Sequence, residues 1–245
     1  MSDTSSDLEL QLSAHALAAL QEFKQEEQER LEKFQNLYNV ADNKFEEDRK
    51  QHGMELFKED WQLSQFWYTE ETAKLLATAL LEGADENTCI AVVSAPSVYA
   101  AIQTFHEDKI PTKNIYLLEY DKRFEMLAGK DNFFFYDYVN PLDFDDRIKG
   151  KVDRLLIDPP FLNKHCQENS SITAKALLKP NDNSKTDFGY PKHRLISCTG
   201  ERMAEVISAV YPDTKVTDFY PEHANGLSNE FRCYANFEWD KWKFI

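Results

Sequence analysis

The sequence predicts an α/β protein with a mostly parallel, doubly wound β-sheet, and three observations carry this prediction. Short apolar runs alternate with amphipathic stretches from about residue 61 onward, as strands do when helices connect them. The early apolar runs are continuous, which is typical of strands buried on both faces. The last two runs follow each other without a convincing helix between them, so we expect an antiparallel hairpin at one edge of the sheet.

The first predicted element of this domain is a helix from about residue 70 to Leu81. The Thr69 side chain can accept a hydrogen bond from the first turn, and Gly83 can follow the helix end in a left-handed conformation. Beyond it, apolar runs and helical stretches alternate. The predicted strands are residues 89–95, 114–121, 133–138, 153–160, 194–200, 215–221 and 231–239. The predicted helices are residues 97–108, 122–129, 170–178 and 201–210, and residues 180–193 are a polar loop.

Residues 1–60 form a separate, charged N-terminal extension ahead of the 61–245 domain. Apolar side chains recur at helical spacing on this segment, at Leu20, Phe23, Leu31, Phe34 and Tyr38. The pattern predicts a helix, and it fits either a solvated, partly flexible arm or a docking helix for a partner.

The net charge of −15 and the sequence pI of about 4.8 disfavour nucleic acid as a partner, because phosphates are neutralised by Lys and Arg. A basic protein or a cationic small molecule fits this charge better. The four cysteines form no CxxC pair and no metal-ligand spacing with histidine, so we expect buried thiols and no metal. The first residues lack a signal-peptide pattern and no run is long enough to span a membrane, so we expect a soluble, cytoplasmic protein.

In open α/β sheets, ligands bind beyond the carboxyl ends of the strands, so the residues at those ends are the candidates for a site. Three of the first four predicted strands end in a carboxylate. Acids also flank strands because they favour turns, but their repetition in one series of strands favours a binding site. The candidates are Ser94, Ala95, Pro96 and Ser97 after the first strand, Glu119 and Tyr120 at the second, Asp137 and Tyr138 at the third, and Asp158, Pro159, Pro160 and Phe161 at the fourth.

These residue types suit a nucleoside. The Glu119 carboxylate can accept hydrogen bonds from two ribose hydroxyls, and Asp137 can accept one from an exocyclic amine beside the Tyr138 ring. No GxGxxG or P-loop motif follows the first strand, so a dinucleotide or ATP would lack its phosphate cradle. A nucleoside ligand without a pyrophosphate points to S-adenosylmethionine.

The start of the helix at residue 70 is the candidate site for the methionine tail, because a helix N-terminus favours a carboxylate. The residues concerned are Trp67, Tyr68 and Thr69. The two aromatic rings are explained equally well as core residues.

The stretch Asp158-Pro159-Pro160-Phe161 combines an acid, a rigid backbone and an aromatic ring. The prolines fix the chain, so the Asp158 side chain and the Pro159 carbonyl can be held as acceptors for N–H groups. Phe161 supplies a flat wall that can pack on a base or lie over a cationic amine. The stretch resembles the (Asn/Asp/Ser)-Pro-Pro-(Tyr/Phe) motif of amino-group methyltransferases.

A wider set of blocks resembles the eukaryotic lysine methyltransferases of translation elongation factor 1-alpha, which were formerly described as N6-adenine-specific DNA methyltransferases. Seven blocks occur in order between residues 61 and 238: WQLSQFWY, SAPSVY, EYDKRF, FYDYVNPLD, DPPF, CTG and LSNEFRCY. The N-terminal segment at residues 10–23, LQLSAHALAALQEF, also matches. The resemblance implies a seven-stranded, Rossmann-like class I methyltransferase fold with an antiparallel last strand, and S-adenosylmethionine as methyl donor. Ser94-Ala95-Pro96-Ser97 stands where most methyltransferases carry a glycine-rich loop.

The acceptor is either a lysine or an adenine. Lysine is cationic, with a reference pKa near ~10.4, and an acidic chain attracts basic proteins and repels DNA. The charge and the resemblance together favour a lysine of elongation factor 1-alpha, held by Asp158 and Phe161. An N6-adenine methyltransferase and a non-catalytic binding subunit are the alternatives. The polar residues His223, Asn225, Asn229 and Glu230 either border the substrate channel or form a loop of turn residues.

Overall fold

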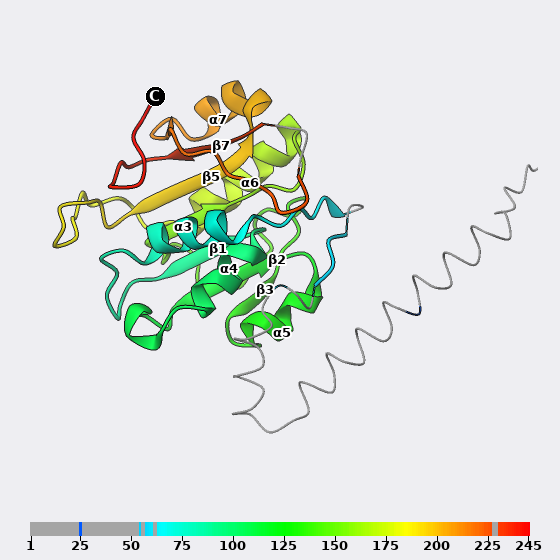
Figure 1. Ribbon diagram of the computed structural model, residues 1–245, viewed down its shortest axis with the longest axis horizontal. Helices are drawn as coiled ribbons and strands as arrows, with labels where there is room; N and C mark the ends of the chain where they lie inside the picture. The colour runs from blue at the N-terminus through cyan, green and yellow to red at the C-terminus, as the bar shows by residue number, and fades with distance from the viewer. Residues whose placement is uncertain (1–24, 26–53, 55–56, 61–62, 227–229) are drawn as a thin grey trace, which may run out of the picture. The chain divides into compact units, whose positions relative to one another are not determined.

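The computed structural model describes residues 25, 54, 57–60, 63–226 and 230–245 of the chain (Figure 1). The chain divides into two units, Met1–Asp48 and Arg49–Ile245, and the β-sheet lies entirely in the second. The helix predicted in the N-terminal extension lies outside the described residues, apart from Gln25.

A single seven-stranded sheet forms the centre of the second unit, in the order β3-β2-β1-β4-β5-β7-β6 (Figure 1). The first five strands are parallel, and β7 runs antiparallel to both of its neighbours. This confirms the predicted mostly parallel sheet and the antiparallel hairpin at one edge. The strands are β1 (Ile90–Val93), β2 (Ile115–Glu119), β3 (Phe133–Phe135), β4 (Arg154–Ile157), β5 (Arg194–Gly200), β6 (Lys215–Val216) and β7 (Phe231–Ala235).

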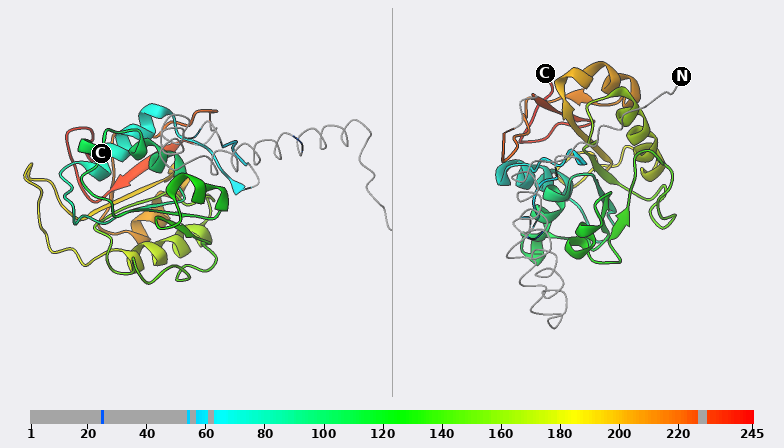
Figure 2. Two further views of the ribbon diagram at one scale, coloured as in Figure 1. Left: turned by 90° about the horizontal axis from the view of Figure 1, so that it is seen from below. Right: turned by 90° about the vertical axis from the view of Figure 1, so that its right-hand side faces the viewer.

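Helices cover both faces of the sheet (Figure 2). They are α3 (Glu70–Leu81), α4 (Pro96–Gln103), α5 (Glu125–Ala128), α6 (Lys164–Leu177) and α7 (Ala204–Val210). Helices α3 and α4 pack together on one face, while α6 and α7 pack together on the other. Every residue of β1, β4 and β5 is buried, as the continuous apolar runs predict for strands covered on both sides.

Helix α3 begins and ends where the sequence predicts. The Thr69 hydroxyl accepts a hydrogen bond from the Thr72 N–H (3.2 Å), and Gly83 follows the helix with φ +60°. The last carbonyls of α3 are capped by two buried arginines from the sheet. Arg154 donates to the Leu80 carbonyl (2.7 Å), and Arg194 donates to the Ala79 carbonyl (2.6 Å). Cations at a helix C-terminus also complement the helix dipole.

Helix α6 begins six residues earlier than predicted. Its first turns are polar and carry no apolar stripe, so periodicity does not reveal them. The start is fixed by Asn163, whose side chain accepts a hydrogen bond from the Cys166 N–H (2.9 Å). Helix α4 is shorter than predicted, because it ends at Gln103 and a separate 3₁₀ turn, Glu107–Lys109, follows.

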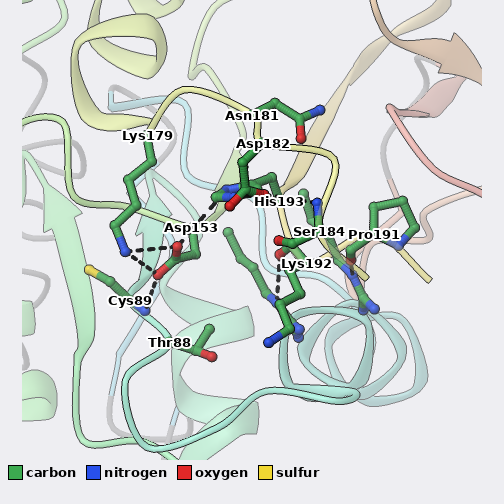
Figure 3. Close-up of polar contacts among 12 residues, drawn as sticks. Thr88, Cys89, Asp153, Lys179, Asn181, Asp182, Ser184, Pro191, Lys192 and His193 are labelled. Carbon is green, nitrogen blue, oxygen red and sulfur yellow. Dashed lines mark hydrogen bonds and ion pairs between the residues drawn. The ribbon is translucent and has the colours of Figure 1, made fainter. Parts of the chain in front are cut away.

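The polar loop at 180–193 is anchored at the amino ends of the strands (Figure 3). Asp153 accepts hydrogen bonds from the Lys179 ammonium (2.8 and 2.9 Å) and from the Cys89 N–H (2.8 Å). His193 lies beside Asp153, and its Nε2 is 3.1 Å from an Asp182 carboxylate oxygen. These contacts hold the loop to β4 and β1, far from the carboxyl ends of the same strands.

The four cysteines are free and buried, as predicted. Among the residues that the structure describes, no group of His, Cys, Asp and Glu side chains has the arrangement of a metal site. Within the same residues, no helix is long and apolar enough to cross a membrane.

Candidate active site

The carboxyl ends of β1, β2, β3 and β4 surround a cavity of about 530 Å³. Residues from all four predicted strand ends line it, so the parallel topology brings together side chains that are up to 67 positions apart in the sequence. The predicted residues in its wall are Trp67, Ser94, Ala95, Pro96, Ser97, Glu119, Tyr120, Asp137, Tyr138, Asp158, Pro159, Pro160 and Phe161.

The turn from β1 into α4 brings backbone close to the cavity. Ser94 has φ +56°, a left-handed conformation that serine seldom adopts, and its N–H donates to the Leu118 carbonyl (2.9 Å). Such a conformation costs about 1–3 kcal/mol and places Ala95 and Ser97, both small and buried, at the wall. The turn thus brings small side chains and backbone to the cavity wall without a glycine.

Glu119 ends β2 with its side chain in the cavity wall. Its Oε1 accepts the N–H groups of Tyr120 (2.9 Å) and Asp121 (3.2 Å), and Oε2 has no hydrogen-bond partner among the described residues. Burial raises the pKa of Glu119 to about 7. The neighbouring acid Asp121 pairs with Arg123 (2.6 Å) and lies outside the cavity lining.

Asp137 and Tyr138 form the wall at the end of β3. Asp137 accepts the Val139 N–H (2.9 Å), which fixes the turn. The Tyr138 ring meets the Phe161 ring edge-on, with centroids 5.7 Å apart. Since Phe161 belongs to the segment after β4, two neighbouring strand ends supply one aromatic corner of the cavity.

Asp158 continues from β4, and its N–H donates to the Val93 carbonyl (3.0 Å). Its Oδ2 accepts a hydrogen bond from the Tyr68 hydroxyl at 2.6 Å, while Oδ1 has no partner among the described residues. Burial raises the pKa of Asp158 to about 7, the Tyr68 hydrogen bond lowers it, and the nearby Glu119 charge raises it. Together with Oε2 of Glu119, Oδ1 of Asp158 gives the cavity wall two carboxylate oxygens that can accept a hydrogen bond from a ligand.

Only one of the three residues predicted to hold the methionine tail lines the cavity. Trp67 does so, and its indole N–H donates to the Phe57 carbonyl (3.2 Å). Tyr68 is buried behind the wall with its hydroxyl on Asp158, and the Thr69 hydroxyl caps α3. A direct contact of Tyr68 or Thr69 with a donor stays a prediction.

The polar segment near the C-terminus lies only partly in the cavity wall. His223 lines the cavity, whereas Asn225 donates to Glu59 (2.9 Å) outside it. Asn229 lies outside the described residues. Glu230 is exposed and lies outside the lining, near Arg232 (3.4 Å). Their binding of substrate stays a prediction.

Several further residues line the cavity that the sequence does not single out as site residues. Some adjoin the predicted strand ends, and the others precede α3, follow β5 or begin β7. They are Leu63, Ser64, Gln65, Phe66, Tyr136, Val139, Leu162, Arg202 and Phe231.

The chemistry of the cavity follows from its three carboxylates and its aromatic corner. Glu119, Asp137 and Asp158 supply acceptors for hydroxyl and N–H groups, and their charge favours a cation. Phe161 and Tyr138 supply flat apolar surface. This arrangement suits a ligand that combines a nucleoside with a positive charge, next to an amine.

Comparison with known proteins agrees with this geometry. A family model described as "Probable N6-adenine methyltransferase" matches residues 59–239. The protein-lysine N-methyltransferase EFM5 of Saccharomyces cerevisiae is 71% identical over 95% of this chain and 94% of its own. EEF1A lysine methyltransferase 1 of Homo sapiens is 39% identical over 97% of each chain.

Among solved structures, a mutein of the branched-chain polyamine synthase of Thermus thermophilus has the same fold, with a TM-score of 0.52. It is 12% identical over 79% of this chain and 63% of its own. This likeness concerns the fold alone, whereas the sequence relatives match nearly end to end. The chain therefore belongs to the eukaryotic family of elongation factor 1-alpha lysine methyltransferases.

Proposed function

We propose that this protein transfers a methyl group from S-adenosylmethionine to the side-chain amine of a lysine in translation elongation factor 1-alpha. One observation carries the proposal: the open Oδ1 of Asp158 and the Phe161 ring share a cavity with Glu119. The names of the relatives in yeast and human support the reaction and the protein substrate.

The donor fits the part of the cavity formed by β1, β2 and β3. The unpartnered Oε2 of Glu119 would accept from the ribose, and Asp137 beside Tyr138 would accept from the adenine amine. The turn at Ser94–Ser97 and the Trp67 side chain would hold the methionine tail at the start of α4. When bound, the donor supplies a methyl group on a positively charged sulfur, which the three carboxylates favour.

The acceptor fits the part of the cavity formed by Asp158, Pro159 and Phe161. Oδ1 of Asp158 and the Pro159 carbonyl would accept the N–H groups of the amine and turn its lone pair toward the methyl carbon. The lysine ammonium would first lose a proton to water. The neutral amine would then form the N–C bond as the C–S bond breaks, and S-adenosylhomocysteine would leave. Alignment is the main task of the protein, because this displacement needs no covalent enzyme intermediate.

Adenine is the second candidate acceptor, because the matching family model is described by that activity. The net charge of −15 opposes it, since a polyanion would have to approach a cavity lined by three carboxylates. A lysine-bearing protein is attracted by the same charge. A protein that works on elongation factor is expected in the cytoplasm.

Incubating the protein with labelled S-adenosylmethionine and either elongation factor 1-alpha or DNA separates the two acceptors. We expect label on the elongation factor and none on DNA. Calorimetry of the protein with the donor alone tests the third possibility, a non-catalytic subunit. We expect binding, and its absence would remove the enzyme assignment altogether.

A further inference from the structure

Tyr68 is the one described side chain that hydrogen-bonds Asp158, from a position that precedes it by 90 residues. The ring is buried, with 4% of its surface exposed. It is held by an isolated β-bridge to His223 and by the His223 ring, whose centroid is 4.8 Å away. The backbone on either side is tied down as well, because the N–H of the next residue, Thr69, donates to the Glu222 carbonyl (2.8 Å).

The direction of the Tyr68–Asp158 hydrogen bond is settled by charge. Burial, and then the nearby Asp158 charge, raise the pKa of Tyr68 well above its usual range, so the phenol keeps its proton. The phenol has a single hydrogen, and at 2.6 Å it goes to Oδ2 of Asp158. The carboxylate can then turn only Oδ1 toward a ligand.

We infer that Tyr68 is a positioning residue for methyl transfer, which favours the ionised form of Asp158 and presents its Oδ1 to the acceptor amine. The inference rests on the proposed function, since it assumes that the amine binds at Asp158. Tyr68 acts through Asp158 and not on the substrate, because it does not line the cavity.

The surroundings of Asp158 explain why such a partner is needed. The charge of Glu119 from β2 opposes ionisation of Asp158. The thiols of Cys198 from β5 and Cys166 from α6 are neutral. The hydrogen bond with Cys233, and then burial, raise the pKa of Cys198 well above its usual value, and burial raises that of Cys166. His223 is neutral too, since burial lowers its pKa to about 4. Arg202 is the described cation in the cavity lining, and it donates to the Leu162 carbonyl (3.0 Å). Since no cation contributes to the Asp158 shift, the Tyr68 hydroxyl is the main support of the carboxylate.

Replacing Tyr68 with Phe removes the hydroxyl and keeps the ring on His223. A hydrogen bond to a charged group is lost, so we expect the pKa of Asp158 to rise by about 1–2 units. A carboxyl group that is protonated at neutral pH no longer accepts the amine. Relative to wild type, kcat should fall about tenfold at pH 7 and recover to within about twofold at pH 9.

Tyr211→Phe is the matched control, because it removes a buried tyrosine hydroxyl that has no hydrogen-bond partner among the described residues. Its pH–rate profile should superimpose on that of wild type. A Tyr68→Phe profile with the wild-type shape, or a loss of rate that is equal at pH 7 and pH 9, would overturn the inference.

Carboxyl NMR provides a readout that needs no acceptor. The Asp158 signal, assigned by its loss in Asp158→Asn, should titrate at higher pH in Tyr68→Phe than in wild type. An unchanged midpoint refutes the role of Tyr68 even when transfer to elongation factor is observed. If the midpoint rises in Tyr68→Phe while the wild-type protein transfers no methyl group to elongation factor, that result supports the Tyr68–Asp158 coupling and refutes the proposed substrate.

Discussion

At the scale of single residues, the proposed chemistry rests on two carboxyl groups that are buried where ionisation is unfavourable. Glu119 and Asp158 both have a pKa raised to about 7 by burial, and each has one oxygen without a partner among the described residues. Groups with raised pKa values that gather in a cavity are typical of functional sites, because a core gains nothing from them.

Asp158→Ala should reduce methyl transfer at least ~100-fold, because the amine loses the acceptor that aligns it. The fold should survive, since Asp158 makes no side-chain hydrogen bond to the described residues besides the one from Tyr68. Steady-state kinetics and circular dichroism measure the two effects. Normal turnover by a correctly folded variant would show that Asp158 does not act in methyl transfer.

Glu119→Gln should weaken donor binding and stabilise the fold. A raised carboxyl pKa means that ionised Glu119 costs folding free energy, a cost that grows from about pH 4.5 to pH 7 and is constant above. Glutamine removes the charge and keeps an acceptor for the N–H groups of Tyr120 and Asp121. We expect a gain of about 2 kcal/mol in unfolding free energy at pH 8 and none at pH 4.

Denaturant unfolding at the two pH values, with calorimetry of the donor, measures both consequences of Glu119→Gln. A gain that is the same at pH 4 and pH 8 would show that the Glu119 charge is not its cause.

At the scale of elements, the sequence predicts those helix and strand positions that neighbouring residues determine. The start of α3 follows from Thr69, and the strands follow from their apolar runs, but the start of α6 at Asn163 has no apolar stripe to reveal it. The capping of α3 by Arg154 and Arg194 could not be predicted from the sequence. Those arginines lie 74 and 115 residues away from the carbonyls they bind, and only the assembled sheet brings them there.

Arg194→Leu should lower the unfolding free energy by about 3–5 kcal/mol, because it leaves the Glu82 carboxylate and a helix carbonyl without their partner. The exposed pair of Lys74 and Glu70 on the same helix is the control. Lys74→Ala should cost less than about 1 kcal/mol. Chemical denaturation of both variants measures the contrast, and equal costs would contradict the capping role of Arg194.

At the scale of the whole molecule, the parallel topology explains why so much of the site could be predicted. The carboxyl ends of the parallel strands meet at one edge of the sheet, so the four short segments at the ends of β1, β2, β3 and β4 form most of the cavity wall. Residues 63–67, Arg202, His223 and Phe231 complete the wall from other parts of the chain. The role of Tyr68 behind Asp158 likewise depends on the folded chain, since nothing in its local sequence indicates that contact.

The overall charge decides between the two acceptors that the Asp158-Pro159-Pro160-Phe161 motif allows. A net charge of −15 favours a basic protein over a nucleic acid. The three carboxylates in the cavity wall favour the same class of acceptor. The motif is typical of enzymes that methylate an amine, and the net charge favours lysine as the source of that amine.

Mass spectrometry of elongation factor 1-alpha tests this central claim most directly. The substrate is purified from cells that lack the protein and is incubated with S-adenosylmethionine, with and without the purified protein. We predict that the protein adds methyl groups to a lysine and that this lysine stays unmodified without it. An elongation factor with no added methyl group, under conditions in which the protein binds the donor, would contradict the proposed lysine methylation.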